Sequence, residues 1–202
     1  YNERVTYKKK MLSAQQEFEN TKDNKYKKLI SRYNNIQMAR KISLNSAYGA
    51  IGNQYFRYYD KAIAEGITKS GQLSIRWIEN RLNKYLNNIL KTDDDYVIAS
   101  DTDSVYLTLD KLVTKTIKSD NALSKTINFL DKVASESIEP YITKSYDELK
   151  QYTNAFANKM FMKREVIADK GIWVAKKRYI LNVWNSEGVS YKEPKLKMMG
   201  IE

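Results

Sequence analysis

The stretch YVIASDTDSVYLTL, residues 96–109, decides how the chain is interpreted because it places two aspartates between two runs of strand-forming residues. The residues between the runs are small and polar, and such residues favour tight turns. The pattern therefore predicts a β-hairpin with Asp101 and Asp103 at its tip.

Two carboxylates at one tip repel each other, and a cation between them removes this cost. Oxygen ligands at this spacing suit Mg²⁺, which binds a few carboxylates and completes its shell with water and substrate phosphate. The alternative is ordinary turn chemistry, in which Asp and Ser side chains hydrogen-bond their own backbone. Taken alone, the hairpin leaves both interpretations open.

The composition limits the chemistry that the chain can perform. Its 202 residues include no Cys and no His, which excludes disulfides, thiol nucleophiles, His-dependent triads and zinc sites of the usual kind. Catalysis must then rely on carboxylates, Lys, Tyr or a bound metal. The longest apolar runs are only a few residues, so the sequence predicts no transmembrane segment.

The net charge of +11 points to a polyanionic partner, because Lys and Arg gain affinity by releasing counterions from phosphates. Residues 1–53 hold 11 Lys and Arg against 4 Asp and Glu, so most of the excess lies in the first quarter. The charge alone does not distinguish nucleic acid from an acidic membrane surface or from a merely soluble face.

The first quarter of the chain predicts a helical hairpin. Residues 1–20 lack Gly and Pro and predict a helix, which the polar cluster at residues 19–24 breaks. A second helix is expected at residues 25–48, with Gly49 as its stop. Because the turn is so short, the two helices must pack antiparallel.

Further helices are expected at residues 60–90 and 120–152. The first of these has an approximate apolar stripe made of Ile63, Ile67, Leu73, Ile75, Ile78, Leu82 and Leu86. Three consecutive aspartates at residues 93–95 are a possible metal site, but a charged helix end in solvent explains them more simply.

Strand-like runs follow at residues 160–162, 173–175 and 179–184, and the last turns back at residues 185–188. Helices combined with hairpins predict an α+β fold, in which an antiparallel sheet is backed by helices.

One face of the second helix carries chemistry. Lys41, Asn45 and Tyr48 share this face, immediately before Gly49. A cation, an amide and an aromatic ring in a row can bind phosphate, hydrogen-bond a base or sugar, and stack. The alternative is a solvated Lys beside a packed Tyr.

The partner helix has a related pair, because Arg4 and Lys8 are four residues apart. If these side chains face the same cleft as Lys41, the three cations would neutralise a triphosphate.

Three motifs occur in a fixed order: KISLNSAYG at residues 41–49, DTDS at residues 101–104 and KKRY at residues 176–179. In this order the chain resembles family B DNA polymerases, with their fingers, palm and primer-contact motifs. Flanking text resembles the T4-like bacteriophage branch in particular, namely FRYYD at residues 56–60, SGQ at 70–72, RWIE at 76–79 and NVW at 182–184.

The resemblance implies template-directed DNA synthesis, in which a deoxynucleoside triphosphate is joined to a primer 3′-hydroxyl with two Mg²⁺ ions. Asp103 is then a metal ligand, and Asp101 lies beside it in the same metal-binding turn as a further candidate ligand. Arg4, Lys8 and Lys41 grip the triphosphate, and Lys41 gives a proton or positive charge to the leaving pyrophosphate.

The resemblance also implies contacts with primer–template DNA. Asn45 and Tyr48 lie against the nascent base pair, and Gly49 lets the template approach closely. The late basic strand contacts the primer near its growing end through Lys176, Lys177, Arg178 and Tyr179. Glu165 matches an auxiliary acidic position, with a salt-bridge role equally open.

The implied domains are fingers at residues 1–53 and the C-terminal part of the palm at residues 54–202. An upstream region or polypeptide is expected to carry the exonuclease and another metal-binding Asp, so the chain alone is expected to be catalytically incomplete; the thumb is expected to follow. The implied location is the host-cell cytoplasm, without a membrane. The open alternatives are a non-catalytic DNA-binding half of a split or degenerate polymerase, and a carboxylate-metal phosphatase or calcium-binding hairpin.

Overall fold

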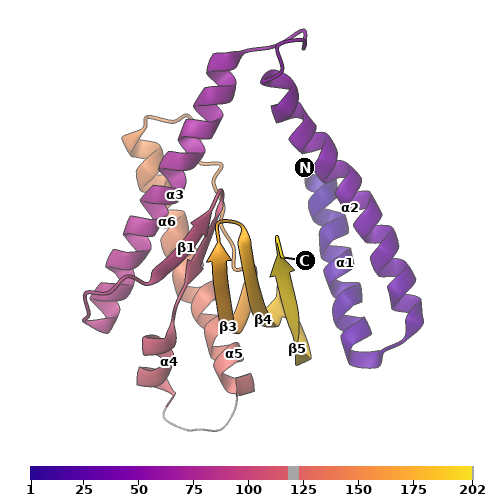
Figure 1. Ribbon diagram of the computed structural model, residues 1–202, viewed down its shortest axis with the longest axis vertical. Helices are drawn as coiled ribbons and strands as arrows, with labels where there is room; N and C mark the ends of the chain where they lie inside the picture. Colours follow the sequence, from indigo (N-terminus) through magenta and orange to yellow (C-terminus); the bar gives the residue numbers. More distant parts are fainter. Residues whose placement is uncertain (118–122, 202) are drawn as a thin grey trace. The chain divides into compact units, whose positions relative to one another are not determined.

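The computed structural model describes residues 1–117 and 123–201. The chain divides into two compact units, each described by itself below. Unit 1 comprises Tyr1–Thr68, Ala168–Ile172 and Ile180–Met198. Unit 2 comprises Lys69–Ile167, Trp173–Tyr179 and Met199–Glu202. Figure 1 labels the helices and strands, and the predicted α+β class is confirmed.

Unit 1 begins with the predicted antiparallel hairpin of α1 (Asn2–Thr21) and α2 (Asn24–Ile51). The Asp23 side chain caps α2 by accepting a hydrogen bond from the Lys25 N–H at 2.9 Å. An ion pair between Glu3 and Arg40 joins the start of one helix to the later part of the other. The prediction that Gly49 ends the second helix was wrong, because α2 continues to Ile51 with Gly52 as its C-cap.

Helix α3 (Lys61–Leu90) begins after Asp60, whose carboxylate accepts a hydrogen bond from the Ile63 N–H at 3.0 Å. The later part of the predicted stripe is buried, with Ile78 and Leu82 in the core of unit 2. The earlier part is not, because Ile63 and Ile67 are 53% and 49% exposed and Leu73 is exposed as well. The apolar stripe is therefore buried only in the C-terminal half of the helix.

The predicted aspartate hairpin is present in unit 2 as β1 (Val97–Asp101) and β2 (Ser104–Leu107). The strands are antiparallel, and Asp101 pairs with Ser104. A short helix, α4 (Asp110–Thr116), follows and was not predicted. Tyr96, just before β1, is buried, and its hydroxyl forms a hydrogen bond with the Thr92 hydroxyl. This contact holds the chain where it enters the hairpin.

The predicted helix at residues 120–152 is divided into α5 (Leu123–Val133), the π-helix η1 (Ala134–Ile138) and α6 (Glu139–Tyr152). Its expected start at residue 120 lies outside the described residues. Helix α6 packs its apolar side on α3, and the Trp77 indole donates a hydrogen bond to the Ser145 carbonyl at 2.9 Å.

The second sheet has the order β3 (Val166–Ala175), β4 (Arg178–Ser186) and β5 (Val189–Met199), with two-residue turns between neighbours. Strand β5 was not predicted, and the strand expected at residues 160–162 is irregular backbone. The turn at residues 185–188 is confirmed, and the Gly188 N–H donates to the Asn185 side chain.

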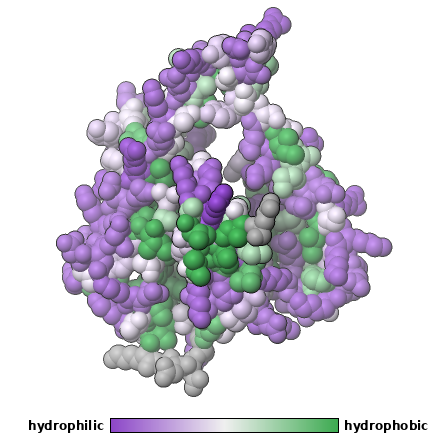
Figure 2. Space-filling view, in the orientation of Figure 1, coloured by the Kyte–Doolittle hydropathy of each residue, from purple (hydrophilic) through white to green (hydrophobic). Residues whose placement is uncertain are grey.

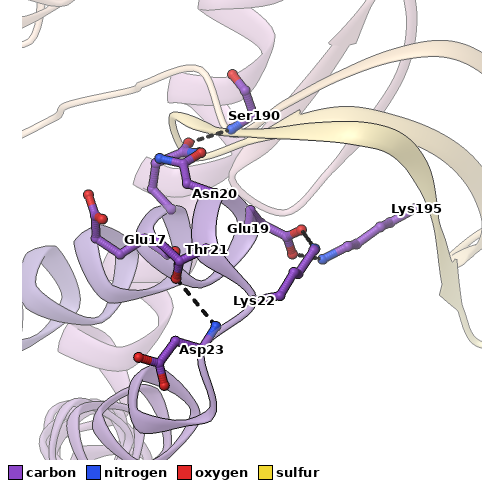
Figure 3. A network of polar contacts seen from close by, with 9 residues as sticks. Glu17, Glu19, Asn20, Thr21, Lys22, Asp23, Ser190 and Lys195 are labelled. Carbon is purple, nitrogen blue, oxygen red and sulfur yellow. Dashed lines mark hydrogen bonds and ion pairs between the residues drawn. The ribbon is translucent and has the colours of Figure 1, made fainter.

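Polar contacts join α1 to the last hairpin within unit 1. The buried carboxylate of Glu19 accepts hydrogen bonds from Lys22 and Lys195, and Figure 3 shows both lysines pointing at it. The Ser190 N–H donates to the Gln16 side chain at 2.9 Å. The sheet edge therefore holds this helix through side chains more than 170 residues away in the sequence.

Acid should weaken this attachment. Burial raises the pKa of Glu19, but hydrogen bonds from Lys195 and Lys22 outweigh it, so the folded pKa lies below the ordinary value of 4.5. The stabilisation is therefore present above 4.5 and is lost as the pH falls through the folded pKa. Urea unfolding at about pH 6 and about pH 3 should show a larger loss of stability for the unsubstituted chain than for Glu19→Gln.

Glu17→Gln is the matched control because Glu17 lies on the same helix but is exposed. Its acid dependence should equal that of the unsubstituted chain. Equal acid dependence for the Glu19 variant would contradict the assignment.

The face drawn in Figure 2 is largely hydrophilic, as a chain with 29% charged residues requires. Hydrophobic side chains nevertheless reach the surface on β5, where Leu196 and Met198 are exposed. Among the described residues, no helix combines the length and the apolar character needed to cross a membrane.

Candidate metal and phosphate site

The tip of the β1–β2 hairpin is a two-residue turn made of Thr102 and Asp103. The Asp103 N–H donates to the Asp101 carbonyl at 2.6 Å, and the Ser104 hydroxyl donates to the same carbonyl at 3.0 Å. The Thr102 hydroxyl donates to the Asp101 carboxylate at 2.9 Å. The turn thus presents two carboxylates two residues apart, with Asp103 exposed and Asp101 half-buried.

Thr102 has a φ of 55°, in the left-handed region that β-branched residues rarely adopt. Such a conformation costs about 1–3 kcal/mol and persists only where neighbouring contacts impose it. Here the three hydrogen bonds that Asp101 accepts hold Thr102 in this conformation and close a tight turn.

Relieving this strain should stabilise the fold. Thr102→Gly should be more stable than Thr102→Ala by about 1 kcal/mol, because glycine alone adopts this φ without a Cβ penalty. The Ala variant is the matched control, since both substitutions remove the hydroxyl. Urea denaturation measures the difference, and a Gly variant no more stable than the Ala variant would show that the turn is unstrained.

Asp103 acts on the interior of unit 2. Burial and the negative charge of Asp103 together raise the pKa of Tyr146, a buried residue of α6. The charge of Asp103 therefore adds to the effect of burial on the pKa of Tyr146, and a cation at the tip would reduce that added effect.

A basic turn lies beside the same tip. The Lys177 ammonium is 3.9 Å from the Asp101 carboxylate, and Lys177 has a φ of 62°. The prediction that this motif forms a strand was partly wrong: Lys176 and Lys177 form the turn between β3 and β4, and Arg178 and Tyr179 begin β4. The turn therefore places the Lys177 ammonium within ion-pair distance of the Asp101 carboxylate.

Tyr179 lies under this turn and is 6% exposed. Its ring centroid is 5.5 Å from that of Tyr106 and 6.3 Å from that of Trp173. Burial raises the pKa of Tyr179, and a hydrogen bond with Tyr106 raises it further, as do the charges of Glu165 and Asp101. Tyr179 is therefore a packing residue whose hydroxyl lies near both acidic groups.

Within the described residues, no group of three or more acidic residues is close enough to hold a metal ion. The donor set at the tip consists of Asp101 and Asp103, and Glu165 is exposed at the start of β3. The carboxylate oxygens at the tip have the chemistry that Mg²⁺ prefers.

The other predicted residues lie in unit 1 on the helical hairpin. Lys41, Asn45, Tyr48 and Gly49 are exposed on α2. The Thr68 hydroxyl donates to the Ala64 carbonyl at 3.0 Å, so it accepts the 2.8 Å hydrogen bond from the Tyr48 hydroxyl. Sequence reasoning missed Thr68, because nothing in its spacing distinguishes it from other residues of the helix.

On α1, the Lys8 ammonium is 2.6 Å from the Glu187 carboxylate in the β4–β5 turn. One helical turn earlier, the buried Nε of Arg4 has no hydrogen-bond partner among the described residues. Glu187 was also missed, since a contact 179 residues away leaves no local pattern.

The chain is thus an α+β protein with a candidate metal site at the hairpin tip of unit 2 and a separate set of candidate phosphate-binding cations on the helices of unit 1. Residues 2–133 match the family described as DNA polymerase family B, and the chain belongs to this family. The predicted likeness to T4-like phage polymerases is confirmed as well. A DNA-directed DNA polymerase of Escherichia phage RB69 is 46% identical over 176 residues, 82% of this chain and 20% of that protein.

The DNA-directed DNA polymerase of Enterobacteria phage T4 is 43% identical over 182 residues, 84% of this chain and 20% of that protein. A DNA polymerase of Choristoneura biennis entomopoxvirus is 24% identical over 168 residues, 68% of this chain and 17% of that protein. The chain thus spans about a fifth of the length of the two phage relatives.

Proposed function

We propose that the chain forms the fingers and the C-terminal part of the palm of a template-directed DNA polymerase, with the fingers at residues 1–53 and the palm at residues 54–202. The reaction is nucleotidyl transfer from a deoxynucleoside triphosphate to a primer 3′-hydroxyl. The observation that carries the proposal is the carboxylate turn with Lys177 3.9 Å from Asp101, in a chain of this family.

Asp101 and Asp103 are the proposed Mg²⁺ ligands, with Asp103 the principal one. These two carboxylates would hold Mg²⁺, which would supply Lewis-acid activation of the primer hydroxyl and charge stabilisation of the pyrophosphate. The tight turn at Thr102 holds Asp101 and Asp103 close together in the chain before the ion binds, which lowers the cost of assembling the site. Glu165 is an auxiliary acid near the Tyr179 hydroxyl.

Arg4, Lys8 and Lys41 are the proposed triphosphate ligands. Lys41 is the proposed proton donor to the leaving group, and the absence of His from the sequence leaves Lys as the side chain suited to this task. A triphosphate role for Arg4 is supported by its Nε, which has no hydrogen-bond partner among the described residues and is therefore not taken up by an internal acceptor.

Asn45 and Tyr48 are proposed to contact the nascent base pair, and Gly49 the template. The hydrogen bond to Thr68 fixes the Tyr48 ring, which reduces the entropy lost when a base pair packs on it. Lys176, Lys177 and Arg178 are proposed to contact the primer backbone, and Tyr179 supports their turn from beneath.

Primer extension tests the proposal. The purified chain is assayed with Mg²⁺ and primer–template DNA, alone and with an upstream polypeptide that carries a further metal-binding Asp. Extension in the mixture is expected. Binding of DNA without extension in either assay would identify a non-catalytic DNA-binding half instead, and failure to bind DNA would overturn the proposal.

A further inference from the structure

The side of α1 that carries Lys8 is already occupied by the chain itself. Lys8, Gln16 and Glu19 fall on one face of the helix. Each contacts the β4–β5 hairpin, through the turn residue Glu187, the Ser190 N–H and the Lys195 side chain respectively. All of these residues belong to unit 1.

The contact with Glu187 is the one that bears on binding. The two side chains are 34% and 21% exposed, so the pair is partly withdrawn from water, and the 2.6 Å separation is that of a charge-assisted hydrogen bond. A phosphate oxygen that binds the Lys8 ammonium must compete with this carboxylate.

Glu187 lies in a tight turn that places it for the contact with Lys8. Its φ of 51° lies in the left-handed region, and the Asn185 side chain accepts a hydrogen bond from the Gly188 N–H across the same turn. These features form a closed two-residue turn that places Glu187 at the tip of the hairpin, where its carboxylate contacts Lys8.

Arg4, the neighbouring cation on α1, differs from Lys8 in its pairing. The buried Nε of Arg4 has no hydrogen-bond partner among the described residues. The same stretch of α1 therefore combines one cation that is paired with an internal carboxylate and one cation whose buried donor lacks an acceptor among the described residues.

We propose that the Glu187 carboxylate competes with the triphosphate for the Lys8 ammonium. By pairing with Lys8, this carboxylate holds α1 on the β4–β5 hairpin until a polyphosphate displaces the carboxylate. The inference rests on the proposed role of Lys8 in triphosphate binding. Because the two anions exclude each other at one ammonium, polyphosphate binding and the attachment of α1 are linked reciprocally.

The first test measures the affinity of the chain for inorganic tripolyphosphate by calorimetry at fixed ionic strength. Glu187→Gln keeps the shape of the side chain and removes the competing charge, so it should bind about 5-fold tighter. Glu193→Gln is the matched control, because Glu193 is exposed on the same hairpin and the substitution changes the net charge equally.

The gain must act through Lys8. In the Lys8→Gln background, Glu187→Gln should bring no increase in affinity. Equal affinities for Glu187→Gln and Glu193→Gln would overturn the competitor role while leaving the triphosphate role of Lys8 intact. If Lys8→Gln leaves the affinity of the Glu187→Gln variant unchanged, the triphosphate role itself is wrong and the inference is overturned with it.

A second measurement follows the attachment directly. The sequence contains no Cys, so Gln16→Cys with Ser190→Cys introduces one unique thiol pair where the two elements touch. Tripolyphosphate should slow disulfide formation in this variant several-fold, and adding Glu187→Gln should slow it without the ligand. Rates that respond to neither change would overturn the inference.

Discussion

Asp103→Asn should reduce primer extension in the reconstituted mixture by at least about 10³-fold, with DNA binding nearly unchanged. The substitution keeps the size of the side chain but removes the charge that attracts the metal. A loss of about 4 kcal/mol in transition-state stabilisation corresponds to this factor. Single-turnover extension measures the rate, and gel-shift titration measures DNA binding.

Asp93→Asn is the control because it removes one exposed carboxylate from unit 2 outside the hairpin. It should leave extension within about 2-fold, since exposed charges away from the site contribute little. Activity that survives Asp103→Asn would remove this residue from the metal site, whereas Asp101→Asn should have the smaller effect of the two.

The carboxylate hairpin was predictable because its signals are local. Strand formers flank four small polar residues, and this contrast alone marks two strands and the turn between them. The strain at Thr102 was not predictable, since a β-branched residue gives no sign of a positive φ and only the hydrogen bonds of the folded turn impose it.

Long-range contacts explain most of the other differences. The four residues of the KKRY motif read as one basic strand, yet Lys177 adopts a left-handed conformation and Tyr179 is buried under Tyr106 and Trp173. Tertiary packing in unit 2, which decides both features, has no signature in four consecutive residues.

The apolar stripe of α3 also shows that a local sequence pattern does not predict long-range packing. Its periodicity is real, but a period states which residues share a face and not how far a partner covers that face. Ile78 and Leu82 meet α6 and are buried, whereas Ile63 and Ile67 remain exposed. The pattern thus predicted the helix correctly but carried no information on how much of its apolar face is buried.

Lys41→Ala should lower the rate of the chemical step by about 10²- to 10⁴-fold, the range expected for the loss of a general acid. Lys41 is exposed on α2, so the substitution removes no packing and the fold should be retained. Single-turnover extension with saturating deoxynucleoside triphosphate separates the chemical step from binding.

Lys41→Arg distinguishes proton donation from simple charge. Arginine keeps the positive charge, and with it most of the triphosphate affinity, but it does not release a proton at accessible pH. The Arg variant should therefore bind triphosphate nearly as tightly as the unsubstituted chain does but extend the primer slowly. Lys28→Ala, an exposed lysine of the same helix, should change neither quantity. A fully active Arg variant would mean that Lys41 stabilises the leaving group by its charge alone, and the proton would then have to come from water.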